Sequence, residues 1–253
     1  MIGSTGAAGV ALALAACSGS AGDSTDGSDG GVTATTLGLP DEASELGAGS
    51  FQLFSESDQN FQTLIALGAA RYAGQVGEVI TVVDQANAAE GGATYQGIFD
   101  AIVVMGNALE ERATAAANAG RRVTARNQYM RAAQYYNQAL YWVLGTSTPG
   151  DEAEVYRTMD AAFTQAAERM DPEWEKVAIP YDQGELAAWF VKPVNASGRL
   201  PVVIMNNGSD GQNVDMVGQG SAEAAERGYG VLIFEGPGQG NQLFLNNVVF
   251  RPD

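Results

Sequence analysis

The sequence contains no histidine, and this absence excludes more chemistry than any other feature of its composition. Histidine is the usual general base near neutral pH and the commonest metal ligand in proteins. A serine–histidine–acid mechanism and most zinc sites are therefore closed to these 253 residues as they stand. The sequence also contains no Gly-x-Ser-x-Gly pattern. We expect no catalytic residues, no metal ligands and no cofactor within this chain.

Basic residues are scarce as well. Thirteen lysines and arginines stand against thirty acidic residues, which gives a formal net charge of −17, and only Lys176 and Lys192 are lysines. A surface with this charge repels nucleic-acid phosphates, so we expect no nucleic-acid partner. Hydrophobic residues make up 45% of the chain, enough for a sizeable core in one or two domains.

The single cysteine, Cys17, excludes an intramolecular disulfide and lies in an informative place. Residues 6–16 form a short apolar run that is too short to span a bilayer but suits a signal peptide. Leu14-Ala15-Ala16-Cys17 resembles the bacterial lipobox, although no lysine or arginine precedes it. The alternative is an apolar N-terminus with an incidental cysteine. We predict a lipoprotein signal peptide over residues 1–17, lipidation of Cys17, and a lipid-anchored protein of the bacterial cell envelope.

The segment after Cys17 is poor in side chains that a core could bury. Residues 18–31 read SGSAGDSTDGSDGG and contain no large apolar residue. Such a composition cannot offset the entropy cost of ordering the chain. We therefore predict a disordered linker over residues 18–50.

Helical periodicity dominates residues 51–170, which we expect to form one helical domain. Segments that begin near Phe61, Val76 and Tyr95 have apolar residues at helical spacing, and Gly120 is a stop signal for the third. A last helix is expected from about Glu152 to Arg169. The strongest pattern covers residues 122–144, with an apolar face made of Tyr129, Ala132, Ala133, Tyr136, Ala139, Leu140 and Val143.

Short apolar runs and glycine-rich turns replace this pattern after Asp171-Pro172. Residues 174–181 and 185–191 predict a hairpin of two strands. Residues 200–205 and 229–234 predict two strands buried in a parallel sheet, with a helix between them that ends at Gly228. We expect residues 171–253 to form a separate α/β domain.

Several of these segments together resemble a known family. The loop NNGSDGQNVDM, the later segment AAERGYGVLIFEGPGQG and the helical segments LIALGAARYAG and RRVTARNQYMRAAQYY are similar to α/β-hydrolases related to 2,6-dihydroxypseudooxynicotine hydrolase. Prolyl-oligopeptidase-like esterases and peptidases are more distant relatives. The resemblance covers about residues 55–253. It implies an α/β fold in which an N-terminal helical cap domain precedes the incomplete first half of an α/β-hydrolase sheet, truncated before the nucleophile elbow.

The resemblance also implies a role for the loop after the strand at residues 200–205. In this fold, a backbone N–H from that loop helps to stabilise the oxyanion of the transition state. The corresponding residues are Gly208, which allows close approach of the backbone, and Ser209, whose N–H would be the donor. The alternative is an ordinary Asn-Gly turn.

Two other features admit functional interpretations that we consider weaker. Gly236-Pro237-Gly238-Gln239-Gly240 follows a strand, as a dinucleotide-binding loop does, but Pro237 removes an N–H that a phosphate would use. Glu235 ends a strand where α/β proteins place functional groups, although bordering a pocket is commoner there than acid–base chemistry. Arg122, Arg126 and Arg131 are expected to pair with neighbouring acids on a helix face.

Two functions remain open at this point. The first is the N-terminal fragment of a secreted hydrolase that cleaves an ester, amide or carbon–carbon bond in a small molecule and is inactive as it stands. The second is a non-catalytic helical binding lipoprotein at the cell surface. A Gly-x-Ser-x-Gly within a few tens of codons downstream would favour the first, and an unrelated gene would favour the second. The sequence predicts no oligomeric state.

Overall fold

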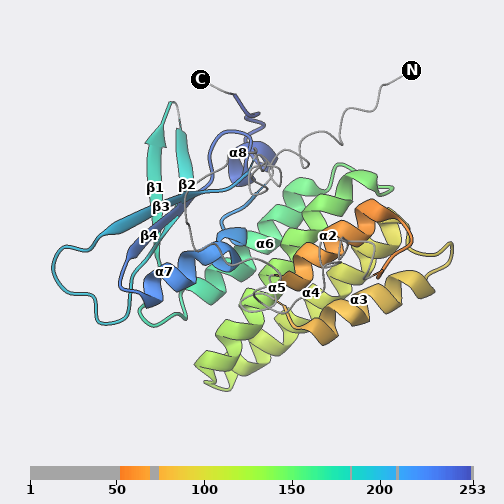
Figure 1. Cartoon of the computed structure of the whole chain (residues 1–253), viewed down its shortest axis with the longest axis horizontal. Coiled ribbons are helices and arrows are strands. Elements are labelled where there is room, and N and C mark those ends of the chain that lie inside the picture. Colours follow the sequence, from red (N-terminus) through yellow and green to blue (C-terminus); the bar gives the residue numbers. More distant parts are fainter. Residues whose placement is uncertain (1–51, 69–73, 183, 209–210, 252–253) are drawn as a thin grey trace, which may run out of the picture. The chain divides into compact units, whose positions relative to one another are not determined.

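The computed structural model describes residues 52–68, 74–182, 184–208 and 211–251 (Figure 1). The described residues belong to one compact unit. Helices come first along the chain and a four-stranded mixed sheet follows, so the α/β fold class predicted from the sequence is confirmed. The expected signal peptide, Cys17 and the linker over residues 18–50 lie outside the described residues.

The helical region has long helices where the apolar periodicity predicts them. Its helices are α2 (Ser57–Gly68), α3 (Val76–Ala88), α4 (Tyr95–Asn118), α5 (Arg122–Trp142) and α6 (Glu152–Ala167). The side chain of Thr94 caps α4 by accepting a hydrogen bond from the Gly97 N–H at 3.1 Å. Gly120 has a φ of +70°, a conformation that glycine adopts without strain, and it separates α4 from α5.

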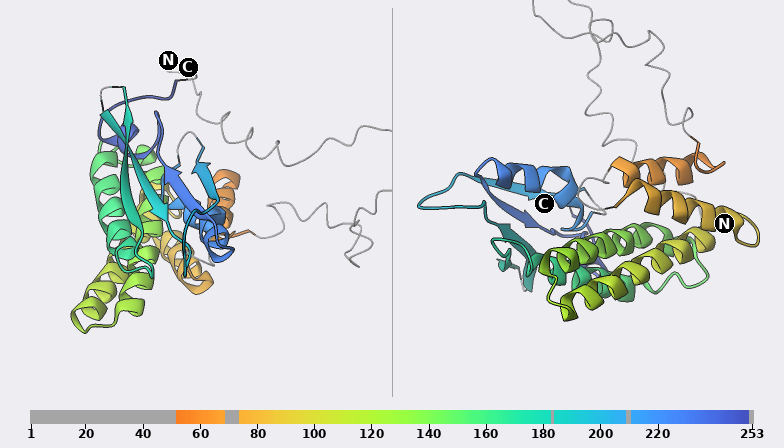
Figure 2. Two further views of the ribbon diagram at one scale, coloured as in Figure 1. Left: turned by 90° about the vertical axis from the view of Figure 1, so that its left-hand side faces the viewer. Right: turned by 90° about the horizontal axis from the view of Figure 1, so that it is seen from below.

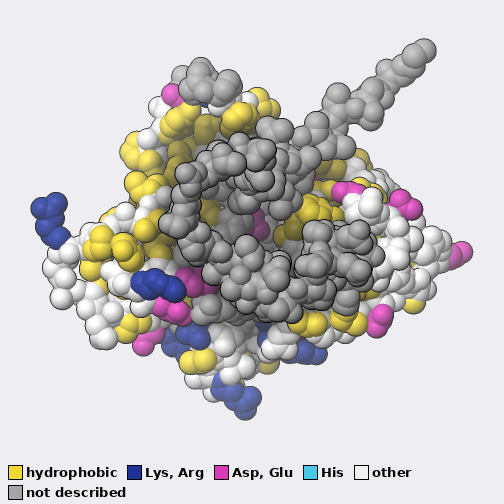
Figure 3. Space-filling model, viewed as in Figure 1, with side chains coloured by type: hydrophobic (Ala, Val, Ile, Leu, Met, Phe, Trp, Pro, Cys, Tyr) yellow, Lys and Arg dark blue, Asp and Glu magenta, His cyan; other side chains and the backbone are white. Residues whose placement is uncertain are grey.

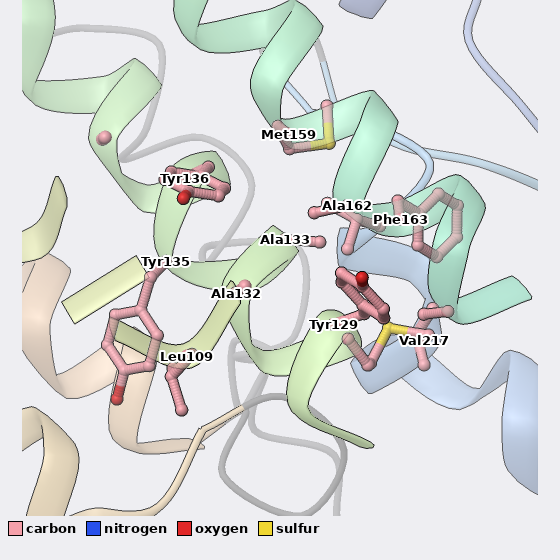
Figure 4. Packing of buried hydrophobic residues seen from close by; sticks show 14 of the residues in the cluster. Leu109, Tyr129, Ala132, Ala133, Tyr135, Tyr136, Met159, Ala162, Phe163 and Val217 are labelled. Atoms are coloured by element: carbon pink, nitrogen blue, oxygen red, sulfur yellow. The ribbon is translucent and has the colours of Figure 1, made fainter. Parts of the chain in front are cut away.

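Helix α5 lies at the centre of the helical region and packs against both α4 and α6. Its predicted apolar face is buried, as Figure 4 shows for Tyr129, Ala132, Ala133 and Tyr136. Gly106 on α4 leaves room for the Tyr136 ring, because an added Cβ would lie only 2.7 Å from it. The opposite face of α5 is buried too and carries polar side chains, which the periodicity did not predict.

Four strands form one sheet in the order β1-β2-β4-β3. The hairpin β1 (Glu175–Tyr181) and β2 (Gly184–Val191) is antiparallel, β2 pairs antiparallel with β4 (Gly230–Phe234), and β3 (Val202–Asn206) runs parallel to β4. The prediction that β3 is buried on both faces is wrong. Among the described strands β3 pairs only with β4, and the side chains of Val202 and Ile204 are 50% and 67% exposed.

The sheet and the helical region lie side by side (Figure 2). Buried side chains of both belong to one hydrophobic cluster. Phe163 of α6 makes edge-on contacts with Trp189 of β2, at 5.6 Å between ring centroids, and with Trp174, at 6.1 Å. The last long helix ends at Ala167 and the first strand begins at Glu175. The division of the chain into a cap domain and a hydrolase domain near residue 171 stays a prediction.

A 3-10 turn at Val143–Gly145 follows α5. Three further short elements complete the described part, and two of these three were not predicted. A π turn at Val217–Ser221 precedes α7 (Ala222–Glu226), and α8 (Gly240–Phe244) follows the loop after β4. The expected loop at residues 235–240 therefore ends in a helical turn. The five residues of α7 are alanine and glutamate, which favour helices, whereas α8 begins with glycine and asparagine, which do not, so only α7 was predicted.

Candidate functional site at the carboxyl edge of the sheet

Strands β3 and β4 end side by side, because they are parallel and Asn206 is in register with Phe234. Two loops therefore meet at this edge. We call residues 207–216 the β3 loop and residues 235–239 the β4 loop. In open α/β sheets, ligands bind at the carboxyl ends of such strands.

The buried side chain of Gln239 joins the two loops. Its Nε2 donates to the backbone carbonyl of Asn207 at 2.6 Å and also to the carbonyl of Gly208. Its Oε1 accepts from the Gly236 N–H at 2.7 Å and from Asn206 Nδ2 at 3.0 Å. One side chain of the β4 loop thus fixes two successive carbonyl groups of the β3 loop.

Side chains within the β3 loop hold its own turns. Asn207 Oδ1 accepts from the Gly208 N–H at 2.8 Å, and Asn207 Nδ2 donates to Asp215 Oδ2 at 3.1 Å. The same carboxylate oxygen accepts from the Gln212 N–H at 2.9 Å. Gly211 has no side chain because Asn207 occupies the space that a Cβ would need. The N–H of Gly208 is therefore bonded to Asn207 and its carbonyl to Gln239, while Ser209 lies outside the described residues.

Helix α5 contacts the far half of the same loop. Gln134 Nε2 donates to the Val214 carbonyl at 2.6 Å, and Asn137 Nδ2 donates to Asp215 Oδ1 at 2.5 Å. Both side chains are about 6% exposed. The helical region therefore contributes directly to the shape of the β3 loop, through two polar residues on a helix whose other face is apolar.

Glu235 is a buried junction between three elements. Its Oε1 accepts from the Asn213 N–H at 2.9 Å, and its Oε2 accepts from Tyr156 Oη at 2.7 Å and from the Asn241 N–H at 2.9 Å. Gly240 leaves room for the carboxylate. Burial raises the pKa of Glu235, although the three donors oppose that shift, and burial next to Glu235 raises the pKa of Tyr156.

The accessibility of Glu235 decides what it does. The side chain is 1% exposed and all three hydrogen bonds come from the protein itself, so it has no free face for a substrate. The acid–base role considered from the sequence is therefore not supported by the geometry. Glu235 joins the β3 loop to α6 and to the start of α8.

The other charged candidates are placed as follows. Arg122 donates to backbone carbonyls at the end of α6 and pairs with Glu173 at 3.2 Å, and Arg131 pairs with Glu78 at 3.4 Å. Arg126 instead donates to the side chain of Asn127, so the expected acidic partner is absent there among the described residues.

No group of three or more potential metal ligands occurs in the described part of the chain. Within it, no helix has the length and apolarity that a membrane crossing requires.

Sequence reasoning missed the residues that shape this edge, namely Gln134, Asn137, Tyr156 and Gln239. A signal existed for two of them, because Gln134 and Asn137 are amide side chains inside a helix predicted to be central. A buried amide is expected to have a specific partner. Periodicity alone did not indicate that this partner is the β3 loop.

The order of the strands, the helical region that precedes them and the glycine-containing loops at the carboxyl edge define an α/β-hydrolase. The crystal structure of 2,6-dihydroxy-pseudo-oxynicotine hydrolase matches with a TM-score of 0.59 and 20% sequence identity, over 70% of this chain and 47% of that one. At this identity the match shows the fold alone. The family model described as Esterase FrsA-like matches residues 100–242, more than half of the chain, and the chain belongs to that family.

Similar proteins from two other organisms are also described as hydrolases. The α/β-hydrolase xenA of Xenoacremonium sinensis is 36% identical over 145 residues, which are 54% of this chain and 33% of that protein. The hydrolase LUC6 of a Fusarium species is 29% identical over 213 residues, which are 80% of this chain and 48% of that protein. The chain therefore spans between a third and half of the length of these relatives.

Proposed function

We propose that this chain supplies the helical cap and the oxyanion-stabilising half of the sheet to a hydrolase that cleaves an ester, amide or carbon–carbon bond in a small molecule. The observation that carries the proposal is the pair of hydrogen bonds from Gln239 to the carbonyls of Asn207 and Gly208. The family supports the hydrolytic class, and it does not specify the bond.

The chemical argument rests on the planar peptide bond. In a trans peptide the N–H and the C=O of the same unit point in opposite directions. A carbonyl that is held towards Gln239 therefore leaves the N–H of the following residue pointing away from Gln239. The Gly208 carbonyl is fixed in this way by Gln239. Backbone N–H groups that are oriented before the reaction stabilise a developing oxyanion without reorganisation. In this proposal Ser209 donates its N–H, and Gly208 lets the substrate approach the backbone.

The chain by itself is proposed to be inactive. A serine hydrolase needs a nucleophile, a base and an orienting acid, and loss of any one costs several orders of magnitude in rate. The base is absent because the chain contains no histidine. The purified chain should therefore hydrolyse p-nitrophenyl acetate no faster than buffer does. Turnover above background that Ser209→Ala abolishes would contradict both the inactivity and the backbone role of this residue.

The positive test uses a longer protein in which this chain is joined to a serine elbow, an acid and a histidine. We expect esterase activity from it. Gln239→Leu should lower kcat more than it raises KM, because an oxyanion hole acts on the transition state. A bulky residue in place of Gly208 should have the same signature. If kcat/KM falls only because KM rises, with kcat unchanged, the two loops bind substrate without stabilising the oxyanion.

We further propose that the protein is anchored in the bacterial cell envelope by a lipid on Cys17. The lipobox-like residues 14–17 and the polar segment that follows them support this proposal. Expression in a bacterial host should incorporate labelled palmitate, and Cys17→Ala should prevent incorporation and release the protein from the membrane fraction. Equal fractionation of both forms, without label, would exclude the anchor.

A further inference from the structure

Two amide side chains of helix α5 hold the β3 loop in different ways. Gln134 and Asn137 are three positions apart, so they lie on the same face of the helix. Gln134 donates to a backbone carbonyl, that of Val214. Asn137 instead donates to a side chain, with 2.5 Å between its Nδ2 and Oδ1 of Asp215. The contact of Asn137 therefore continues into whatever the carboxylate of Asp215 holds.

The carboxylate of Asp215 connects this contact to the start of the loop. Its second oxygen, Oδ2, accepts from Asn207 Nδ2 at 3.1 Å and from the Gln212 N–H at 2.9 Å. At the other end of the Asn207 amide, Oδ1 accepts from the Gly208 N–H at 2.8 Å. Carboxylate and amide groups are planar, so the orientation of each one fixes where the next donor or acceptor lies. A continuous series of hydrogen bonds thus leads from α5 to the N–H of Gly208.

Asp215 differs from the solvated carboxylates of this acidic chain. The chain contains thirty acidic residues, and Figure 3 shows acidic side chains scattered over one face of the molecule. Asp215 is half-buried, and it accepts from α5 through one oxygen and from the β3 loop through the other. A carboxylate accepts hydrogen bonds on both oxygens, so donors on its two sides hold its plane in one orientation.

Asn137 is poorly suited to a role in stability alone. Its side chain is 6% exposed, and its Oδ1 is buried without a hydrogen-bond partner among the described residues. A buried acceptor without a partner costs free energy, which offsets part of what the contact with Asp215 contributes. An amide at this position is therefore better explained by the orientation that it gives to Asp215.

We propose that Asn137 is a positioning residue of the β3 loop. Acting through Asp215 and Asn207, it sets the orientation of the peptide that joins Asn207 to Gly208. The catalytic meaning of this orientation rests on the proposed function, because that peptide precedes the proposed donor, the N–H of Ser209. Helix α5 then contributes to the rate of the proposed reaction without touching the substrate.

The purified full chain, labelled with ¹⁵N, tests the positioning without any activity. Asn137→Asp places a second carboxylate against Asp215 and should break the contact by repulsion. We expect exchange of the Gln212 N–H to accelerate about tenfold, because its acceptor is displaced, and the amide resonance of Gly208 to shift. Asn127→Asp is the matched control, because Asn127 lies exposed on the same helix. This control should change neither signal.

The conservative rescue is Asp215→Asn combined with Asn137→Asp. Together the two substitutions exchange the amide and the carboxylate between the two positions. One N–H···O contact between them is then possible again, and an oxygen still faces Asn207 and the Gln212 N–H. Both signals should return close to those of the unsubstituted chain, because two residues in direct contact do not contribute additively.

Asn137→Ala removes the amide without adding a charge, and it keeps the test decisive if Asn137→Asp does not fold. It should accelerate exchange of the Gln212 N–H several-fold with little change in the urea midpoint, because the unpartnered Oδ1 is removed as well. Unchanged exchange and an unchanged Gly208 resonance in Asn137→Ala would overturn the proposal. So would effects of the double substitution that equal the sum of those of the two single substitutions.

The link to catalysis is tested separately in the longer protein that carries a serine elbow, an acid and a histidine. Asn137→Ala should lower kcat there and leave KM nearly unchanged, because the oriented loop acts on the transition state. An unchanged kcat beside altered exchange would show that the reaction does not use this orientation, which overturns the role of Asn137 in it. If the unsubstituted longer protein hydrolyses no ester, the proposed function fails, and the exchange measurements still decide whether Asn137 positions the loop.

Discussion

Gln239 uses both ends of its side-chain amide at the carboxyl edge of the sheet, and this makes it the most informative single residue to replace. Leucine has a similar size but no polar atoms. Gln239→Leu would leave the carbonyls of Asn207 and Gly208 and the N–H of Gly236 without this partner. Buried polar groups without partners are costly, so we expect the free energy of unfolding to fall by about 2–3 kcal/mol.

Urea unfolding and amide hydrogen exchange check this expectation together. Exchange should accelerate at Gly208 and Gly211 in Gln239→Leu, and the exposed Gln85 of α3 supplies the control Gln85→Leu. Unchanged stability and exchange in Gln239→Leu would show that the β3 loop keeps its shape without the amide.

The raised pKa of Glu235 makes the free energy of unfolding depend on pH in a definite direction. Its pKa in the folded protein lies above the ordinary value of 4.5 because burial disfavours the charged form, and Asp160 acts in the same direction. A carboxyl group with a raised pKa adds stability that is fully present below its unfolded pKa and is lost as the pH rises through the folded value. Glu235→Gln cannot titrate. The stability that the variant loses should therefore be largest near pH 4 and should shrink as the pH rises towards 8.

Urea unfolding at several pH values measures this difference. Glu185→Gln serves as the control, because Glu185 lies exposed on β2. A stability difference that widens with pH would mean that the three donors outweigh burial and that Glu235 is stabilised as the charged form.

At the scale of elements, the long helices were predictable, and of the short helical elements only α7 was. Helices α3, α4 and α5 begin at the residues that the apolar pattern indicated, because each buries a repeated face. Helix α8 depends instead on a contact from elsewhere in the chain, because Gln242 Nε2 donates to the Glu185 carbonyl of β2 at 2.8 Å. No local pattern records such contacts.

The candidate site was predictable only in outline. The strand pattern indicated two glycine-containing loops, and the resemblance to α/β-hydrolases implied roles for Gly208 and Ser209 in the first of them. The partners that shape the edge come from residues as far as 80 positions away in the sequence, as between Gln134 and Val214. A hydrogen bond over that distance follows from the packing of α5 against the β3 loop, which one sequence does not reveal.

Two isoleucines, one in β4 and one in β3, allow the exposure of β3 to be tested with the same substitution. Ile233 in β4 is fully buried, whereas Ile204 in β3 is 67% exposed among the described residues. Ile233→Thr should lower the free energy of unfolding by about 2–4 kcal/mol, because it places a hydroxyl in the core. Ile204→Thr should change it by no more than about 0.5 kcal/mol. Equal losses in urea unfolding would show that the outer face of β3 is covered in solution.

Across the whole described part, polar side chains as well as the apolar core connect the helices to the sheet and its loops. Tyr156 of α6 donates to Glu235 at the end of β4, and Asn137 of α5 donates to Asp215 in the β3 loop. The Phe163 and Trp189 rings pack edge-on in the buried cluster that both regions share. Because the helical region and the sheet lack separate cores, neither is expected to remain folded when the other unfolds.

This expectation is tested by following helix and sheet separately in one urea titration. Trp142 lies in α5 and Trp189 in β2, so variants that keep only one of the three tryptophans report on each region. We expect both fluorescence transitions to coincide with loss of helical circular dichroism. Tyr156→Phe removes one buried hydrogen bond and should lower the free energy of unfolding by about 1 kcal/mol. Both fluorescence transitions should therefore move to lower urea concentration by the same amount. If helical signal survives after the Trp189 signal is lost, the helical region folds as an independent domain, and the boundary near residue 171 predicted from the sequence gains direct support.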